Sequence, residues 1–170
     1  MKKISFQNDV LPLKNQLFRL ALRITLNREE AEDIVQDTLM KLWDKRDDWD
    51  HIDNLEAFSY TVCRNLALDR KRRAANGNES LEEAPVEKPD TARTPSETTI
   101  QRDRMEIVRK LVDSLPEKQR SCIQLRDFEG KSYKEIAAAM QISEDQVKVS
   151  IHRGRQTLRE KFLVIDNYGL

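Results

Sequence analysis

A run of polar and basic side chains near the C-terminus has the chemistry to bind DNA. Between residues 146 and 155 the sequence places Gln146, Lys148, Ser150, His152, Arg153 and Arg155. Lysine and arginine can neutralise phosphates or reach guanine acceptors, while glutamine and serine can bond to base edges. On one face of a helix, such a set suits the major groove of duplex DNA, which is about 12 Å wide. The alternative is an amphipathic hairpin with a solvated basic face.

Two predicted helix starts place the polar and basic residues 146–155 on the second of two helices joined by a short turn. Residues 132–135 read Ser-Tyr-Lys-Glu, a capping box, and residues 143–146 repeat the device with Ser-Glu-Asp-Gln. The first start predicts a short helix through Met140, and the second predicts a helix to Phe162. The spacing of Val147 and Ile151 turns one face of that helix inward and leaves the opposite face polar. The segment therefore reads as a helix-turn-helix.

A second group of residues suited to nucleic acid lies near the middle of the chain. Asn54 is a candidate N-cap for a helix that ends in the four basic residues 70–73. Its inward face is expected to hold Ala57, Phe58, Thr61, Val62, Leu66 and Leu68. Aromatic rings beside cationic groups suit unstacked bases and a phosphate backbone. Phe58 fits the core stripe, however, so packing is its expected role.

An acidic face marks the helix expected after Asn27. It carries Glu29, Glu30, Glu32, Asp33, Asp37 and Lys41, with Gln36 and Met40 beside them, while Ile34, Val35, Thr38, Leu39 and Leu42 point inward. Another apolar stripe, Leu13, Leu17, Leu20, Ala21 and Ile24, predicts a helix before it. Taken alone, such an acidic face is more often solvated than bound to a partner.

The composition argues against an enzyme and against a general DNA-coating protein. Thirty basic and thirty acidic residues give a formal net charge of zero, so any DNA contact must be local. The sequence lacks a phosphate-binding loop, a nucleophile elbow and a metalloprotease motif. The two cysteines and two histidines do not have zinc-ligand spacing. We therefore expect no catalytic residues, no metal and no cofactor.

The organisation is expected to be all-α, with two small helical domains. Residues 76–99 contain three of the five prolines and few apolar residues, so we interpret them as a flexible linker. The domains are then residues 1–75 and 100–165, the second containing the helix-turn-helix. No apolar run approaches the roughly 18 residues that span a bilayer, and no signal peptide is recognisable. A cytoplasmic protein without membrane insertion is expected.

The two motif sets together resemble a known family. The segments EEAEDIVQDTLMKLWDKRDDW, NLEAFSYTVCRNLALDRKRR and LPEKQRSCIQLRDFEGKSYKEIAAAMQISEDQVKVSIHRGRQTLREKF are similar to the two modules of bacterial RNA polymerase sigma factors of the extracytoplasmic-function (ECF) group. The resemblance covers nearly the whole chain except the linker and the last few residues. It implies a dissociable sigma subunit that directs core RNA polymerase to promoters and assists their melting.

The resemblance also implies roles for particular residues. Asp33, Gln36, Asp37 and Lys41 would contact the polymerase β′ clamp. The −10 element, read as single-stranded DNA, would meet Trp49, Asn54, Tyr60, Thr61 and Asn65, with Arg64, Arg70, Lys71, Arg72 and Arg73 along the strand backbone. The −35 duplex would meet Gln146, Lys148, Val149, Ser150, Arg153 and Arg155. Further partners implied are the polymerase β flap and an anti-sigma factor.

The sequence departs from the family pattern at three positions. Val149 and Ser150 stand where a small polar residue and an arginine are common, and Gln141 stands where glycine is common in the turn.

Two other functions remain open as interpretations of the sequence. One is a helix-turn-helix regulator whose first module binds a signalling protein and never touches polymerase, although such a regulator has no reason to carry the basic run 70–73. The other is a structural adaptor, which leaves the basic residues of the last helix unexplained.

Overall fold

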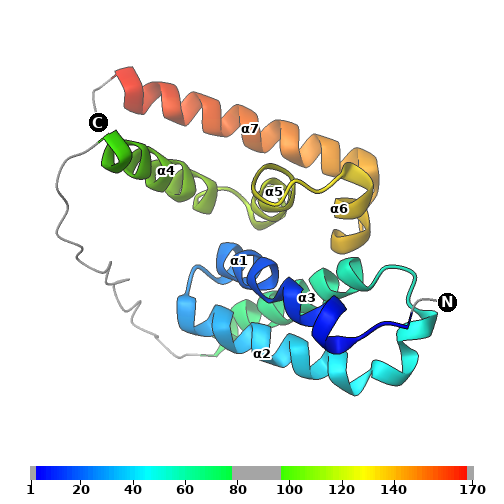
Figure 1. The fold of residues 1–170 in the computed structure, drawn as a ribbon. Coiled ribbons are helices and arrows are strands. Elements are labelled where there is room, and N and C mark those ends of the chain that lie inside the picture. The colour runs from blue at the N-terminus through cyan, green and yellow to red at the C-terminus, as the bar shows by residue number, and fades with distance from the viewer. Residues whose placement is uncertain (1–2, 78–96, 168–170) are drawn as a thin grey trace.

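The computed structural model describes residues 3–77 and 97–167, which form helices and connecting turns without any β-strand. Figure 1 shows two layers: the first module, residues 3–77, lies below the second module, residues 97–167. The principal helices are α1 (Lys14–Thr25), α2 (Arg28–Asp44) and α3 (Leu55–Asn76) in the first module, then α4 (Glu97–Asp113), α5 (Glu117–Ile123), α6 (Tyr133–Met140) and α7 (Glu144–Asn167) in the second. The expected all-α fold with two helical regions is confirmed.

The first module is built on α1 and α2, whose predicted apolar stripes are buried. Leu17, Leu20 and Ile24 of α1 are at most 1% exposed. The chain turns between the helices through Leu26, whose φ of 57° is left-handed. Asn27 then caps α2 by accepting a hydrogen bond from the Glu30 amide at 3.1 Å. The second helix therefore begins after Asn27, as the sequence predicts.

The orientation of α3 differs from the predicted one. Its N-cap is Asn54 as expected, but its fully buried face carries Ala57, Ser59, Tyr60, Cys63 and Ala67. The large residues of the predicted stripe, Phe58, Thr61, Val62, Leu66 and Leu68, are only half-buried. The reason is that α3 lies between α1 and α2 on one side and α6 of the second module on the other. A helix packed on two sides buries small residues where backbones approach closely.

A second apolar cluster closes the end of the first module. Before α1 the chain makes two short helical turns, Phe6–Val10 and Leu11–Leu13, and after α2 it makes a 3₁₀ helix, Arg46–His51. Val10, Leu42 and Trp49 form the buried centre of this cluster. The segment 45–53 is therefore folded back onto the module.

The second module contains both predicted helix starts, at Ser132 and Ser143. Pro116 precedes α5, which continues as a π-helical turn, Gln124–Phe128, before Gly130 with a φ of 71° reverses the chain. Both capping devices form: Ser132 accepts from the Glu135 amide, and Ser143 accepts from the Gln146 amide, each at 3.1 Å. Gly154 lets α7 approach α5, since a Cβ there would meet Ile123 at 2.4 Å.

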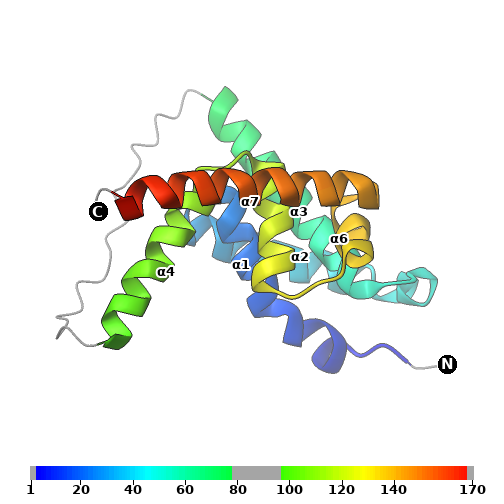
Figure 2. The ribbon, with the colours of Figure 1, turned by 90° about the horizontal axis from the view of Figure 1, so that it is seen from above.

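The two modules share one hydrophobic core. Leu125, Ile136, Ala139 and Met140 of the second module belong to the same buried cluster as α1, α2 and α3. Helix α6 lies on α3, and α5 lies on α1, as the view from above in Figure 2 also shows. Most of the predicted linker 76–99 lies outside the described residues, but Asn76 ends α3 and Glu97 begins α4.

Candidate nucleic-acid interface

Helix α7 carries the side chains predicted to contact duplex DNA, and most of them face solvent. Gln146, Lys148 and Arg153 are exposed, and Val149 is 46% exposed. Ser150 is different, because it is 8% exposed and belongs to the inner face of the helix. In this arrangement Ser150 cannot reach a base edge. The polar face therefore presents one predicted residue fewer than the sequence suggests.

A shallow basic groove of about 360 Å³ runs beside this face. It is lined by Tyr133, Lys148, Ile151, His152, Arg155, Gln156 and Arg159. The Tyr133 ring has the Arg126 guanidinium 4.5 Å from its centroid and the Lys148 amine 5.8 Å from it. Arg155 is held by Asp127 through its Nε at 3.2 Å. His152 was predicted on the polar face of α7, whereas Tyr133, Gln156 and Arg159 were not among the predicted contacts. Tyr133 belongs to α6, and helix spacing within α7 does not reveal which neighbours α6 adds.

The exposed end of α3 forms a second basic surface. Asn65 and the basic residues Lys71, Arg72 and Arg73 are exposed there. A groove of about 780 Å³ crosses this surface and is lined by residues of α2 and α3, among them Lys41, Asn65 and Arg72, and by Gln141 of the second module. Gln141 adopts a φ of 55°, which explains why glycine suits this turn. The groove places Lys41 next to residues predicted to contact the −10 strand.

Three other residues predicted to contact the −10 strand face the second module instead. Tyr60 is 3% exposed, and its hydroxyl donates to the Gln16 side chain. Thr61 donates to the Ala139 carbonyl at 2.8 Å. Arg64 forms a fork with Glu117, both contacts at 3.0 Å. Burial also raises the pKa of the Tyr60 hydroxyl, so this group stays neutral.

Trp49 and Asn54 have structural contacts of their own. Trp49 is 5% exposed, its indole donates to the Leu42 carbonyl at 3.0 Å, and its ring lies parallel to Phe6 at 6.4 Å between centroids. It cannot stack on a base in this arrangement. Asn54 is exposed and caps α3 by accepting from the Ala57 amide at 3.0 Å. Both residues position the start of α3.

The acidic face of α2 is on the surface, and a basic residue of α3 reaches it. Asp33 and Gln36 are exposed, and Asp37 is half-exposed. Arg70 pairs with Asp37 at 3.1 Å and with Asp33 at 3.5 Å. Two residues predicted to contact polymerase and one predicted to contact DNA are therefore in direct contact. Sequence spacing could not show this, since the partners are more than 30 positions apart.

Burial keeps the thiols of the two cysteines protonated. It raises the pKa of the Cys63 thiol to about 12 and that of Cys122 to about 11. Among the described residues, no cluster of histidine, cysteine and carboxylate side chains could hold a metal ion. Within the same ranges, no helix is long and apolar enough to cross a membrane.

Comparison with protein families matches both modules. Residues 10–77 match the family model "Sigma-70 region 2", and residues 105–158 match "Sigma-70, region 4". The chain is 33% identical over 144 residues to the ECF RNA polymerase sigma factor SigL of Mycobacterium tuberculosis, covering 84% of this chain and 80% of SigL. The chain belongs to the ECF sigma factors. Members of this family direct RNA polymerase to promoters for initiation and are not enzymes.

Other ECF sigma factors match as well. SigE of Mycolicibacterium smegmatis is 30% identical over 151 residues, which cover 86% of this chain but 57% of that protein. A solved structure of the sigma factor RpoE from Bartonella quintana, in complex with the anti-sigma factor NepR, superposes with a TM-score of 0.69 at 29% identity. The match covers 94% of this chain and 97% of RpoE, so both modules take part in it.

Proposed function

We propose that this ECF sigma factor is a dissociable subunit that binds core RNA polymerase, reads two promoter elements and assists melting of the downstream one. The observation that carries the proposal is the pairing of two surfaces in one chain. One is the exposed basic face of α7, and the other is the basic end of α3 beside the acidic face of α2. A regulator that bound only duplex DNA would have no use for the second surface.

For the upstream element, α7 is proposed to enter the major groove. Lys148 and Arg153 are exposed and would contact phosphates or guanine, while the exposed Gln146 at the helix start would contact base edges. The basic groove beside α7 would follow the phosphate backbone and add Tyr133 and Arg159 to the predicted contacts.

For the downstream element, α3 is proposed to hold the melted strand. Asn65 and Arg72 line the larger groove, which also contains the half-buried ring of Phe58. Flipping a base out of the duplex costs a few kcal/mol, which stacking and hydrogen bonding in a pocket can offset. Trp49 and Asn54 would act by holding the start of α3, given their contacts inside the module.

For polymerase, the middle of α2 beyond its first turn is proposed to bind the β′ clamp. Asp33, Gln36, Asp37 and Lys41 lie there, and Arg70 orients the two carboxylates from behind. The second module would meet the β flap. By analogy with RpoE bound to NepR, an anti-sigma factor is proposed as a further partner, in a cytoplasmic setting.

The test is transcription with purified core polymerase and this chain on a library of random genomic fragments. Specific transcripts should appear only when the chain is added, and the open region should react with permanganate. Replacing Asp33 and Asp37 together with Ala should weaken core binding at least tenfold, with thermal stability almost unchanged because both side chains lie on the surface.

Glu29→Ala is the matched control, since Glu29 is an exposed carboxylate near the start of the same helix. It should leave core affinity within about twofold, as most surface substitutions do. If the chain binds duplex promoter fragments but opens none of them with core polymerase, the duplex-binding regulator replaces the sigma factor as the function.

A further inference from the structure

We propose that Phe6 is a positioning residue for reading the melted strand. Its ring holds Trp49 in place, and Trp49 fixes the segment 45–53, which begins at the larger groove, the one beside α3. This rests on the proposed function, because it takes that groove as the site that binds the strand. Phe6 lies before residues 10–77, which match the region 2 family model, so neither that match nor the predicted contacts assign it a role.

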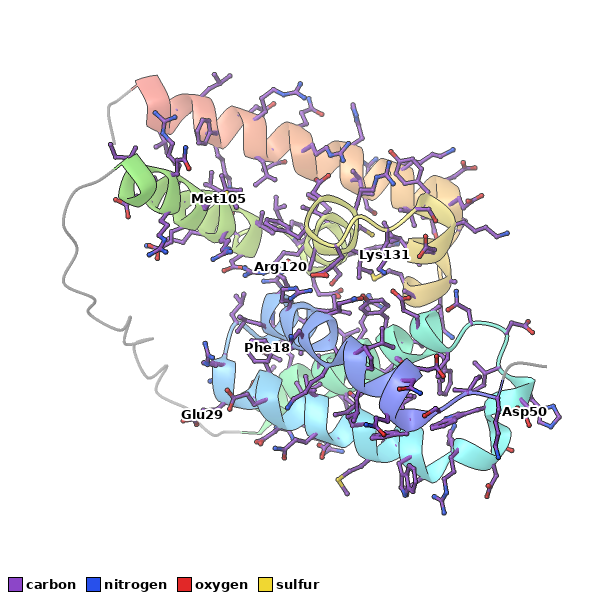
Figure 3. All side chains as sticks on the ribbon, viewed as in Figure 1. Phe18, Glu29, Asp50, Met105, Arg120 and Lys131 are labelled. Atoms are coloured by element: carbon purple, nitrogen blue, oxygen red, sulfur yellow. The ribbon has the colours of Figure 1, made fainter. Side chains whose placement is uncertain are left out.

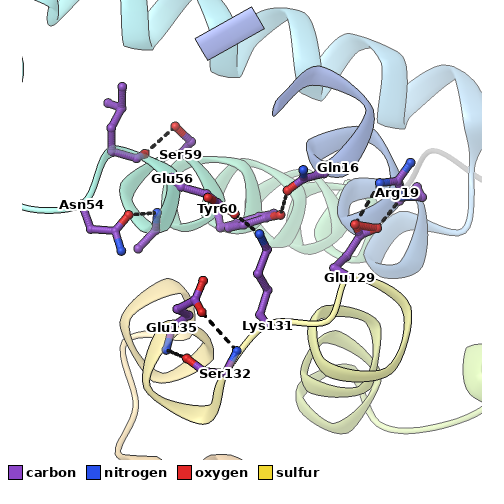
Figure 4. Close-up of polar contacts among 12 residues, drawn as sticks. Gln16, Arg19, Asn54, Glu56, Ser59, Tyr60, Glu129, Lys131, Ser132 and Glu135 are labelled. Carbon is purple, nitrogen blue, oxygen red and sulfur yellow. Dashed lines mark hydrogen bonds and ion pairs between the residues drawn. The ribbon is translucent and has the colours of Figure 1, made fainter. Parts of the chain in front are cut away.

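Trp49 is the buried anchor of the segment 45–53. Among residues 45–51 only Trp49 is buried, at 5% exposure, and the others are exposed. Figure 3 shows Asp50 at the end of the first module where the N-terminal residues also lie. Figure 4 shows the cap Asn54 at the start of α3, directly after the segment. The position of the segment therefore depends on how firmly Trp49 is held.

The N-terminal residues supply part of the enclosure of Trp49. The Phe6 ring lies parallel to the Trp49 ring, with 6.4 Å between centroids and 8° between planes. It also makes a T-shaped contact with the Trp43 ring, with 5.3 Å between centroids. Both geometries are favourable for aromatic pairs. Val10 and Leu42 fill the centre of the cluster beside Trp49. Phe6 therefore contacts both tryptophans of the chain, and one of them is the anchor of the segment.

The same cluster supports one side of the groove. The Phe58 ring packs against the cluster and also lines the groove of about 780 Å³. Lys45, the first residue of the segment, lines the groove as well, and its amine lies 5.5 Å from the centroid of the Phe58 ring. A cation beside an aromatic ring suits an unstacked base and its phosphate. A shift of Trp49 would displace Lys45 and Phe58, so the shape of the groove depends on the Phe6 contact.

The first measurement reads the position of Trp49 directly. The chain has two tryptophans, so Trp43→Phe leaves Trp49 as the only one and keeps an aromatic ring at position 43. In this background the acrylamide quenching constant of Trp49 should be low, because the indole is 5% exposed. Adding Phe6→Ala should raise that constant about threefold, since the lost ring leaves a cavity beside the indole.

The second measurement reads strand recognition by the holoenzyme, assembled from core polymerase and the full chain. The holoenzyme selects from single strands of 20 nucleotides that are randomised at every position. Its affinity for the selected sequence is then compared with its affinity for each single-base change. Phe6→Ala should reduce the preference for the selected bases about fivefold, because recognition requires side chains held to within about 0.5 Å. Duplex binding by α7 should stay within about twofold, as expected of a folded chain.

A rescue variant and a control separate positioning from general damage. Phe6→Tyr keeps the ring at a half-buried position and should return both values to within about twofold of wild type. Leu11→Ala is the matched control in the N-terminal residues, since Leu11 is 41% exposed and is not part of the cluster. It should change neither value. If Phe6→Ala does not fold, Phe6→Leu takes its place, because it keeps apolar volume without a flat ring and should change both values in the same direction.

Three results would overturn the proposal and leave the proposed function standing. Unchanged quenching in Phe6→Ala would show that Phe6 does not hold Trp49. Raised quenching with unchanged base preference would show that Trp49 does not position the strand. A loss that Phe6→Tyr does not repair, or that Leu11→Ala reproduces, would show damage other than the lost ring contact. If the wild-type holoenzyme selects no sequence at all, the proposed function itself fails, and this inference fails with it.

Discussion

The two modules present their predicted DNA contacts in opposite ways. In the second module, Lys148 and Arg153 are exposed on α7. In the first module, Tyr60, Thr61 and Arg64 lie on the side of α3 that packs against α6 or pairs with α5. The exposed face of α7 is therefore accessible in the free chain, whereas the proposed strand-binding surface on α3 is only partly accessible.

The physical reason lies in how many sides of each helix are covered. Helix α7 is covered on one side, by α4, α5 and α6, so its other side stays polar. Helix α3 is covered by α1 and α2 and again by α6, which leaves mainly its C-terminal end in solvent.

The largest expected effect comes from breaking the support of α7. Gly154→Val would force a side chain against Ile123, which is 1% exposed and cannot move freely. We expect unfolding free energy to fall by about 2 kcal/mol, the usual cost of overpacking, as measured by urea denaturation. Val149→Ala, on the exposed side of the same helix, should change it by less than about 0.5 kcal/mol. Equal stability of both variants would contradict the close α5–α7 contact.

The next effect tests whether the duplex-binding surface is already available. Lys148→Ala with Arg153→Ala should weaken binding of the free chain to promoter duplex about tenfold. The logarithmic salt slope should shrink by about 1.8, because each phosphate contact contributes about 0.9. Arg28→Ala, an exposed arginine of the first module, should leave both values unchanged. An unaltered salt slope in the double variant would show that α7 does not contact phosphates.

A smaller effect compares the N-caps of the two modules. Asn54→Ala and Ser132→Ala each remove a side-chain acceptor from a helix start and should each cost about 1 kcal/mol of stability. Because α3 and α6 pack on each other, both variants should lower one common urea transition rather than split it. Two separate transitions in either variant would show that the modules unfold independently.

The smallest effect is on the thiols. Cys63 and Cys122 are fully buried, and their raised pKa values of about 12 and about 11 leave little thiolate at pH 8. The native chain should therefore react with Ellman's reagent only over hours, and both thiols should react within minutes in urea. Rapid reaction of one thiol in the native chain would show that the part of the shared core around that cysteine opens frequently.

Much of the second module could be predicted from the sequence because its signals are local. The serines that cap α6 and α7 accept hydrogen bonds from amides only three positions further along the chain. The exposed face of α7 follows from the same logic, except that Ser150 turned out to be buried. In α3 the predicted stripe was only partly right, because Ala57 is buried but Tyr60 and Cys63 take the most buried positions. A period of 3.6 residues shows which residues share a face but not how many faces are covered.

By itself, the sequence determined the helices, their caps, the order of the two modules and the family to which the chain belongs. Only the tertiary structure decided which predicted contacts are accessible. Arg64 meets Glu117 across 53 positions, and Thr61 meets the Ala139 carbonyl across 78. Such contacts depend on how α5 and α6 settle on α1 and α3, which is set by packing of the shared core and by charge pairing over long sequence separations. Local propensity acts over three or four residues and contains no information about that choice.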